Sequence, residues 1–140
     1  MPKINRIDHI AVVVDELDGP LSFWRDALGL ELTHTRDVPA ELAEVAFLPA
    51  GESEIELVRP TTPDSGLGRY LEKRGPGMHH ICLEVDDLDG MLAQLKDKGV
   101  SLINENPKTG AEGRRYAFIH PKSAGGVLVE LSEPAAEPRP

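Results

Sequence analysis

The sequence predicts an α+β protein built from two paired βαβββ modules. Residues 8–19 can be laid on residues 79–90 at an offset of 71, and seven of the twelve positions are then identical. Far from this phrase, Ala117-Phe118 falls on Ala46-Phe47 at the same offset. Both copies also contain a strand-like run, a helix-like stretch and three further strand-like runs in the same order. This pattern is typical of a duplicated supersecondary unit.

The first module, residues 1–60, opens with the run IDHIAVVV, which has the length and β-branched content of a strand. Asp18 is placed to cap a following helix, Pro20 suits its first turn, and Gly29 suits its end. The helix is predicted by an apolar stripe at Leu17, Leu21, Trp24 and Leu28. Three more strands are expected at residues 30–36, 44–50 and 54–60.

The second module, residues 78–132, repeats this order with a strand at 80–85 and a helix that ends at Lys98-Gly99. Its remaining strands are expected at residues 100–104, 114–120 and 126–132. Between the modules lies a linker, residues 61–77, with a short helix from Leu67 to Arg74. The tail, residues 133–140, has three prolines and little apolar content, so we expect it to be disordered. The two modules together form one domain.

Composition excludes several classes of function. A net charge of −9, from 24 acidic and 15 basic residues, repels a phosphate backbone, so nucleic acid is not an expected partner. No apolar run is long enough to cross a bilayer. Cys82 is the single cysteine, and the N-terminus lacks the pattern of a secretory signal, so a cytoplasmic location is expected.

Polar residues interrupt the apolar strands at related places in the two modules. His9 aligns with His80 at the repeat offset, and each strand that closes a module contains a carboxylate, Glu56 or Glu130. A lone strand histidine is more often structural than a ligand, but its paired occurrence favours a functional site. Two imidazoles and two carboxylates suit a divalent ion such as Co, Mn, Zn or Ni.

The other histidines are weaker candidates for functional residues. His79 is expected to face away from His80 and to have a structural or supporting role. His34 has no partner in the repeat and is expected at the surface. His120, which precedes a proline, is expected either to anchor a loop or to touch a ligand.

Three segments resemble a known family: IDHIAV, DSGLGRYLEKRGPGMHHICLEVDDL and FIHPKSAGGVLVEL. The chain is similar to the vicinal oxygen chelate superfamily and, within it, to the epimerases that act on methylmalonyl-CoA. The resemblance implies a cup-shaped mixed β-sheet around one metal ion in each subunit, usually of a homodimer. The metal ligands it implies are His9, Glu56, His80 and Glu130. Some similar bacterial members have Gln at the position of Glu56.

The reaction implied by this resemblance interconverts (2R)- and (2S)-methylmalonyl-CoA through an enolate. One divalent metal ion would stabilise the charge on the thioester oxygen, with cobalt as the leading candidate and Mn, Zn and Ni as alternatives. Glu44 and Glu130 match the positions of the proton-transfer groups. An acyl-CoA partner also brings phosphates, for which the nearby basic residues are Lys73, Arg74, Arg114, Arg115 and Lys122. A solvated surface explains these five residues equally well.

Two alternatives use the same fold. The first is a glyoxalase I type of lyase that acts on a glutathione adduct through similar proton transfer. The second is a binding protein that sequesters a small toxic molecule without a metal. Because binders of this kind often lose the metal ligands and this chain keeps all four residues, the epimerase is the preferred prediction.

Overall fold

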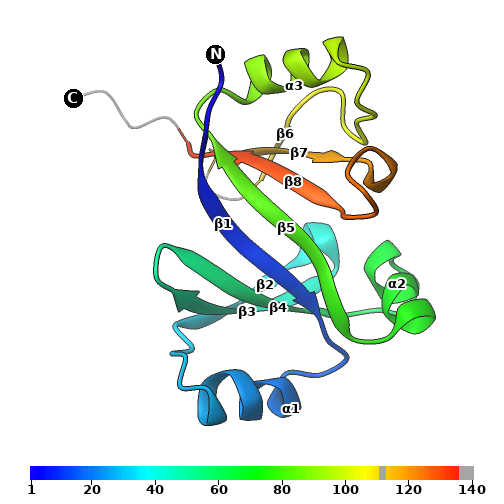
Figure 1. Ribbon diagram of the computed structural model, residues 1–140. Coiled ribbons are helices and arrows are strands. Elements are labelled where there is room, and N and C mark those ends of the chain that lie inside the picture. The colour runs from blue at the N-terminus through cyan, green and yellow to red at the C-terminus, as the bar shows by residue number, and fades with distance from the viewer. Residues whose placement is uncertain (111–112, 136–140) are drawn as a thin grey trace. The chain divides into compact units, whose positions relative to one another are not determined.

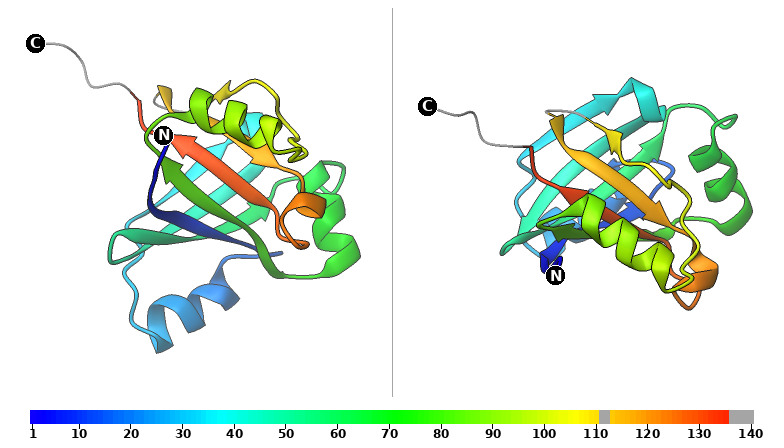
Figure 2. Two further views of the ribbon diagram at one scale, coloured as in Figure 1. Left: turned by 45° about the horizontal axis from the view of Figure 1, so that its top comes forward. Right: turned by 90° about the horizontal axis from the view of Figure 1, so that it is seen from above.

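The computed structural model describes residues 1–110 and 113–135. It divides into two compact units (Figures 1 and 2). One unit consists of residues 9–79, and the other of residues 1–8 together with the described residues from 80 onward. We call them the 9–79 unit and the 80–135 unit. Strands β1 (Ile4–Val13) and β5 (Gly77–Val85) each contribute residues to both units.

The 9–79 unit contains a sheet with the strand order β2-β3-β4-β1, in which β1 and β4 are parallel and the other pairs antiparallel. The strands predicted near 44–50 and 54–60 are confirmed, whereas the strand predicted at 30–36 begins later. The linker helix is also confirmed. The elements after β1 are α1 (Asp18–Leu21), the π-helix η1 (Ser22–Ala27), β2 (His34–Val38), the 3-10 helix η2 (Pro39–Glu41), β3 (Ala43–Ala50), β4 (Ser53–Pro60) and α2 (Gly66–Arg74).

The first helix changes geometry along its length. After the one turn of α1, η1 continues with wider hydrogen bonds, such as that from Leu28 N to Phe23 O at 2.8 Å. The wider turn disrupts the predicted stripe, so Leu21 is buried while Leu28 remains 55% exposed. Gly29 has φ +92° and ends the helix as expected. Asp18 lies inside the helix, whose N-cap is the preceding residue, so its predicted capping role was wrong.

The 80–135 unit has the strand order β5-β8-β7-β6, with β5 and β8 parallel. Helix α3 (Leu88–Asp97) lies along one face of this sheet (Figure 2). It begins where Asp87 accepts a hydrogen bond from Gly90 N at 3.0 Å, and it ends before Gly99, where φ is +78°. The other elements are β6 (Lys108–Thr109), β7 (Arg115–Ile119), the 3-10 helix η4 (Pro121–Ser123) and β8 (Val129–Glu133).

The strand predicted at 100–104 is not formed. Leu102 makes an isolated bridge to Ile119, and Ile103 N donates to Phe118 O at 2.8 Å. The side-chain oxygen of Asn104 then accepts the hydrogen bond of Phe118 N at 2.9 Å. A side chain therefore replaces the backbone as the acceptor, and the ladder stops. Pairing with β7 resumes only at the short β6.

The end of β8 lies one residue beyond the predicted module. Glu133, assigned above to the tail, belongs to the strand and accepts a hydrogen bond from Leu88 N at 3.2 Å. Its carboxylate also contacts Arg115 at 3.0 Å. These contacts join the end of β8 to the start of α3. Of the predicted disordered tail, residues 136–140 lie outside the described residues.

Each sheet packs its helix on one face and carries the repeated histidine and glutamate residues on the other. The helix-covered core of the 9–79 unit consists of Val14, Leu21, Ala46, Leu48 and Leu57. The corresponding core of the 80–135 unit consists of Val85, Leu88, Met91, Leu92, Ala117, Ile119 and Leu131. Since strand residues alternate between faces, His9 and His80 lie on the opposite sides of their sheets from these cores. We call those sides the His9 face and the His80 face.

Candidate metal and active site

The 9–79 unit brings His9 next to Glu56. The parallel register of β1 and β4 sets Ala11 opposite Glu56, two residues beyond His9 on the same face. The His9 Nδ1 atom lies 3.1 Å from Glu56 Oε2, and the two side chains are only 11% and 16% exposed. Phe47 is paired with Glu56 in the neighbouring strand β3. A shielded imidazole and carboxylate pair therefore occupies the His9 face.

The 80–135 unit repeats this pair. His80 Nε2 lies 3.0 Å from Glu130 Oε1, with side chains 13% and 14% exposed. Cys82 is paired with Glu130 in the parallel register of β5 and β8, and Phe118 is paired with it in β7. The Phe118 ring meets the His80 ring edge to face, with centroids 5.4 Å apart.

The two pairs occupy equivalent places in their modules. Ala11 and Cys82, which flank the carboxylates, are 71 residues apart, as are Phe47 and Phe118. The carboxylates themselves are 74 residues apart. The extra length lies between β7 and β8, where η4 occupies a connection longer than the turn between β3 and β4. The connection before the last strand is therefore longer in the second module than in the first.

The donor set of each pair fits a divalent cation. Imidazole nitrogen and carboxylate oxygen both bind such ions at about 2.1 Å, so two neighbouring donors lie about 3.0 Å apart at a right angle and about 3.4 Å apart at a tetrahedral angle. The separations of 3.1 and 3.0 Å in the two pairs agree with the right-angle value. They also agree with hydrogen bonds, which would keep each carboxylate partnered before an ion binds.

Glu44 lies away from these pairs. It is paired in register with Arg59, whose Nε donates to Glu44 Oε1 at 3.0 Å. Strand alternation places Glu44 with Ala46 on the helix-covered side of β3, whereas Phe47 and Glu56 share the His9 face. Glu44 thus lies on the other face of its sheet from Glu56, and its role as a base stays a prediction.

The remaining histidines have identifiable contacts. The His79 ring meets Tyr70 of α2 edge to face at 4.7 Å, as expected for a structural residue. His34 is exposed, as predicted, and stacks on Phe47 at 4.4 Å. His120 accepts a hydrogen bond from Lys122 N at 3.1 Å and caps η4, so its predicted loop-anchoring role is confirmed.

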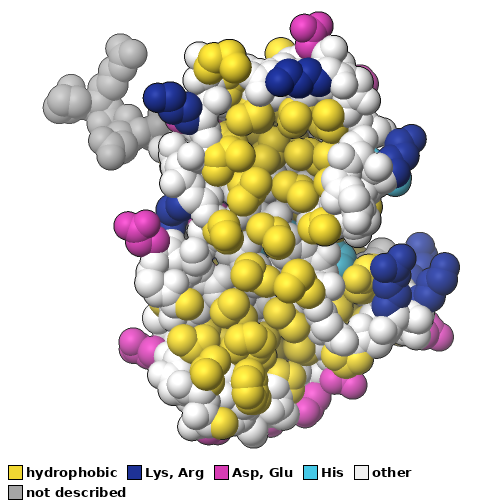
Figure 3. Space-filling view, viewed as in Figure 1, with side chains coloured by type: hydrophobic (Ala, Val, Ile, Leu, Met, Phe, Trp, Pro, Cys, Tyr) yellow, Lys and Arg dark blue, Asp and Glu magenta, His cyan; other side chains and the backbone are white. Residues whose placement is uncertain are grey.

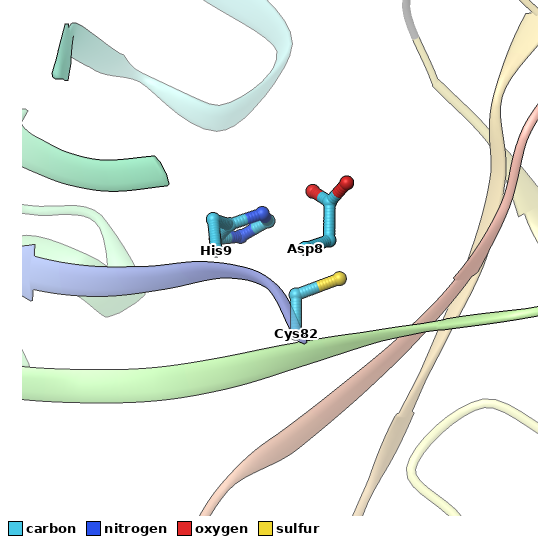
Figure 4. A group of neighbouring side chains, drawn as sticks. All are labelled: Asp8, His9 and Cys82. Atoms are coloured by element: carbon cyan, nitrogen blue, oxygen red, sulfur yellow. The ribbon is translucent and has the colours of Figure 1, made fainter. Parts of the chain in front are cut away.

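A charged network in the 80–135 unit was missed by the sequence analysis. Arg114 Nη2 donates to both Asp8 Oδ1 and Ser132 Oγ at 2.8 Å. The buried Cys82 thiol donates to the same hydroxyl at 3.3 Å. Figure 4 shows the Asp8 and Cys82 side chains extending from β1 and β5. The sequence offered only one signal: an ionisable residue, Asp8, directly before the repeated histidine.

Arg115 makes a separate set of ion pairs. Its guanidinium contacts Asp89 at 2.9 Å and Glu133 at 3.0 Å. The hydrogen bond from Arg115 lowers the pKa of Asp89, and the same bond raises the pKa of Arg115. Of the five basic residues that the sequence offered for phosphate binding, Arg114 and Arg115 are thus engaged by carboxylates of the protein itself.

The family follows from comparison with known proteins. The model of the glyoxalase/bleomycin resistance protein/dioxygenase superfamily matches residues 8–118. The chain therefore belongs to this superfamily, which confirms the expected fold class. No helix within residues 1–110 and 113–135 combines the length and apolar character needed to cross a membrane.

Several relatives within the superfamily are named as methylmalonyl-CoA epimerases. The mitochondrial enzyme of Mus musculus is 38% identical over 94% of this chain and 74% of its own. The ethylmalonyl-CoA/methylmalonyl-CoA epimerase of Cereibacter sphaeroides is 36% identical over 93% and 98%. A methylmalonyl-CoA epimerase solved in complex with methylmalonyl-CoA and ammonium matches with a TM-score of 0.85 and 36% identity. It covers 99% of this chain and 100% of that one.

Proposed function

We propose that the protein epimerises methylmalonyl-CoA by removing the proton at C2 and returning it to the other side of the flat enolate. The observation that carries this proposal is the repeated pair of imidazole and carboxylate, His9 with Glu56 and His80 with Glu130. The epimerases at 36–38% identity, one of them bound to methylmalonyl-CoA, support the choice of substrate.

We assign these four residues as the ligands of one divalent metal ion, with cobalt as the leading candidate. When bound, the ion supplies Lewis-acid stabilisation of the negative charge that develops on the thioester oxygen, an effect of several kcal/mol. Two anionic carboxylates balance the charge of a divalent ion, which favours its retention in a partly buried site.

We assign proton transfer to Glu130, as the sequence predicted, and to Glu56 as its counterpart in the other module. Inversion at C2 needs a proton acceptor on one side of the enolate and a donor on the other. A carboxylate has two oxygens, so one can bind an ion while the other exchanges a proton. Glu44 is replaced in this assignment because its carboxylate binds Arg59 on the helix-covered side.

The CoA phosphates need positive charge from a protein with a formal net charge of −9. Lys and Arg side chains gather at α2 (Figure 3), where the exposed Lys73 and Arg74 form the last turn. Arg74 also lies over the Tyr70 ring at 5.3 Å. We therefore assign phosphate contact to this turn, and expect Lys73→Glu with Arg74→Glu to raise KM for the CoA substrate while kcat is retained.

The decisive experiment measures the exchange of deuterium from the solvent into the substrate. Metal-loaded protein is incubated with (2R)-methylmalonyl-CoA in D₂O, and the expected result is deuterium at C2 together with loss of stereochemical purity. His80→Ala should abolish both. His79→Ala is the matched control, because this neighbouring ring packs against Tyr70, and it should retain exchange. A wild-type protein that leaves the substrate unlabelled would end the epimerase proposal.

The same preparations test the alternative and the substrate range. The hemithioacetal of methylglyoxal and glutathione should not be turned over, since turnover would favour the glyoxalase I type of lyase. Ethylmalonyl-CoA is the second substrate to test, because the relative from Cereibacter sphaeroides is named for both acyl groups. The homodimer and the cytoplasmic location stay predictions, the first to be checked by light scattering of the purified protein.

A further inference from the structure

A network in the 80–135 unit connects the residue before His9 to the strand that contains Glu130. One nitrogen of Arg114, Nη2, donates to Asp8 Oδ1 and to Ser132 Oγ, each at 2.8 Å. Arg6 reaches the same Asp8 oxygen at 3.2 Å. The same Arg6 nitrogen, Nη2, also contacts Glu84 Oε1 at 3.3 Å. Two guanidinium groups and two carboxylates therefore form one charge-balanced cluster.

The acidic members of the cluster are shielded, whereas the Arg6 and Arg114 side chains are each 36% exposed. The Asp8 side chain is 12% exposed, and Ser132 is 1% exposed as a residue. The Cys82 thiol, fully buried, donates to Ser132 Oγ at 3.3 Å. Loss of one partner from a shielded charged group is costly, because the remaining charge is left poorly compensated.

The members of the cluster lie beside the proposed metal ligands. Asp8 directly precedes His9 in the chain, and Ser132 follows Glu130 by two residues on the same face of β8. Cys82 is the register partner of Glu130. The Arg114 bridge thus ties the backbone that leads into His9 to the strand that carries Glu130.

We propose that Arg114 is a positioning residue for the metal site, because it holds Asp8 against Ser132 and so fixes the backbone from which His9 and Glu130 extend. This inference rests on the proposed function. It also gives Arg114 a different role from the phosphate contact that the sequence offered, since its guanidinium is already engaged by the protein. Residues that orient metal ligands typically change metal affinity by about 10–100-fold when they are replaced.

The test measures metal binding in the absence of substrate. Chelator-treated protein is titrated with Co²⁺, and binding is followed by the visible absorption of the bound ion. Arg114→Met should bind Co²⁺ about 10–100-fold more weakly than the wild type. Arg114→Lys should recover part of the affinity, because one ammonium group can reach Asp8 or Ser132 but cannot copy the planar guanidinium.

Arg115→Met is the matched control. This neighbouring arginine pairs with Asp89 and Glu133 at the start of α3, so its loss should lower the melting temperature without changing Co²⁺ affinity. Asp8→Asn should weaken binding as Arg114→Met does. The double variant should lose little beyond the more affected single variant, since both changes break one interaction.

The outcomes separate this inference from the proposed function. Unchanged Co²⁺ affinity in Arg114→Met, an equal loss in Arg115→Met, or additive losses in the double variant would each overturn the positioning role and leave the epimerase proposal intact. A wild-type protein that exchanges the substrate proton but binds no Co²⁺ would overturn both the metal assignment and the role of Arg114. A wild-type protein that binds Co²⁺ without exchange would overturn the epimerase alone.

Discussion

Substitution of Glu44 by Gln distinguishes the structural assignment of the proton-transfer groups from the one that the sequence favoured. In the 9–79 unit, Glu44 contacts Arg59 at 3.0 Å, with side chains 33% and 35% exposed. Ion pairs with this degree of exposure contribute about 0–1 kcal/mol to the free energy of unfolding. Gln keeps the shape and one acceptor oxygen, so Glu44→Gln should cost less than about 1 kcal/mol in a urea titration.

Glu44→Gln should also leave the rate of catalysis nearly unchanged. A group that transfers the proton contributes about 10²–10⁴-fold to the rate, and Glu130→Gln should show a loss of that size. Glu44→Gln should exchange deuterium into (2R)-methylmalonyl-CoA at close to the wild-type rate. A loss above about 100-fold in Glu44→Gln, with normal stability, would show that this carboxylate reaches the substrate and would refute the assignment made from strand alternation.

Three further predictions concern stability. Because the pKa of Asp89 is lowered by Arg115, its ion pair contributes stability that is fully present above the unfolded value of 3.8 and is lost as pH falls through the folded value. Urea titrations from pH 6 to pH 3 should show this loss in the wild type and a smaller one in Arg115→Met. Leu88→Ala should cost about 2–5 kcal/mol, since Leu88, the first residue of α3, is fully buried in the core between α3 and the sheet. Gly68→Ala should destabilise by about 1–3 kcal/mol, because a Cβ there would lie 2.9 Å from backbone carbon atoms of the loop before α2. Gly66→Ala, with open space around its position, should show no loss; equal effects of the two alanines would contradict the steric argument.

The order of the helices and strands could be predicted because the two repeats have the same pattern of apolar and turn residues. The repeat offset was sufficient to identify His9 and His80 as equivalent residues, and Gly99 marked the end of α3. The predictions failed where a side chain or an unusual turn overrode the local pattern. Asn104 took the place of a backbone acceptor and ended a strand, and the π-helical bonds of η1 rotated Leu28 out of its stripe.

The candidate site was only partly accessible from the sequence. Glu56 and Glu130 stood out because a carboxylate within an apolar strand needs a partner. Glu44 could not be placed, because a single sequence does not show which face of β3 the helix covers. Its pairing with Arg59 depends on the register of β3 against β4, which the sequence does not contain either. Arg114 was likewise ambiguous, since the contact with Asp8 joins residues 106 positions apart. Long-range ion pairs of this kind leave no local pattern.

The division of β1 and β5 between the two compact units has a consequence for anyone who separates the duplicated halves. A gene fragment cut at the linker gives a first half that keeps residues 1–8, which belong with the other unit, and a second half that lacks them. Each fragment would expose unpaired strand backbone and should recover solubility only when both are produced in the same cell. The two repeats are therefore separate in the sequence, but residues 1–8 of the first repeat fold with the second.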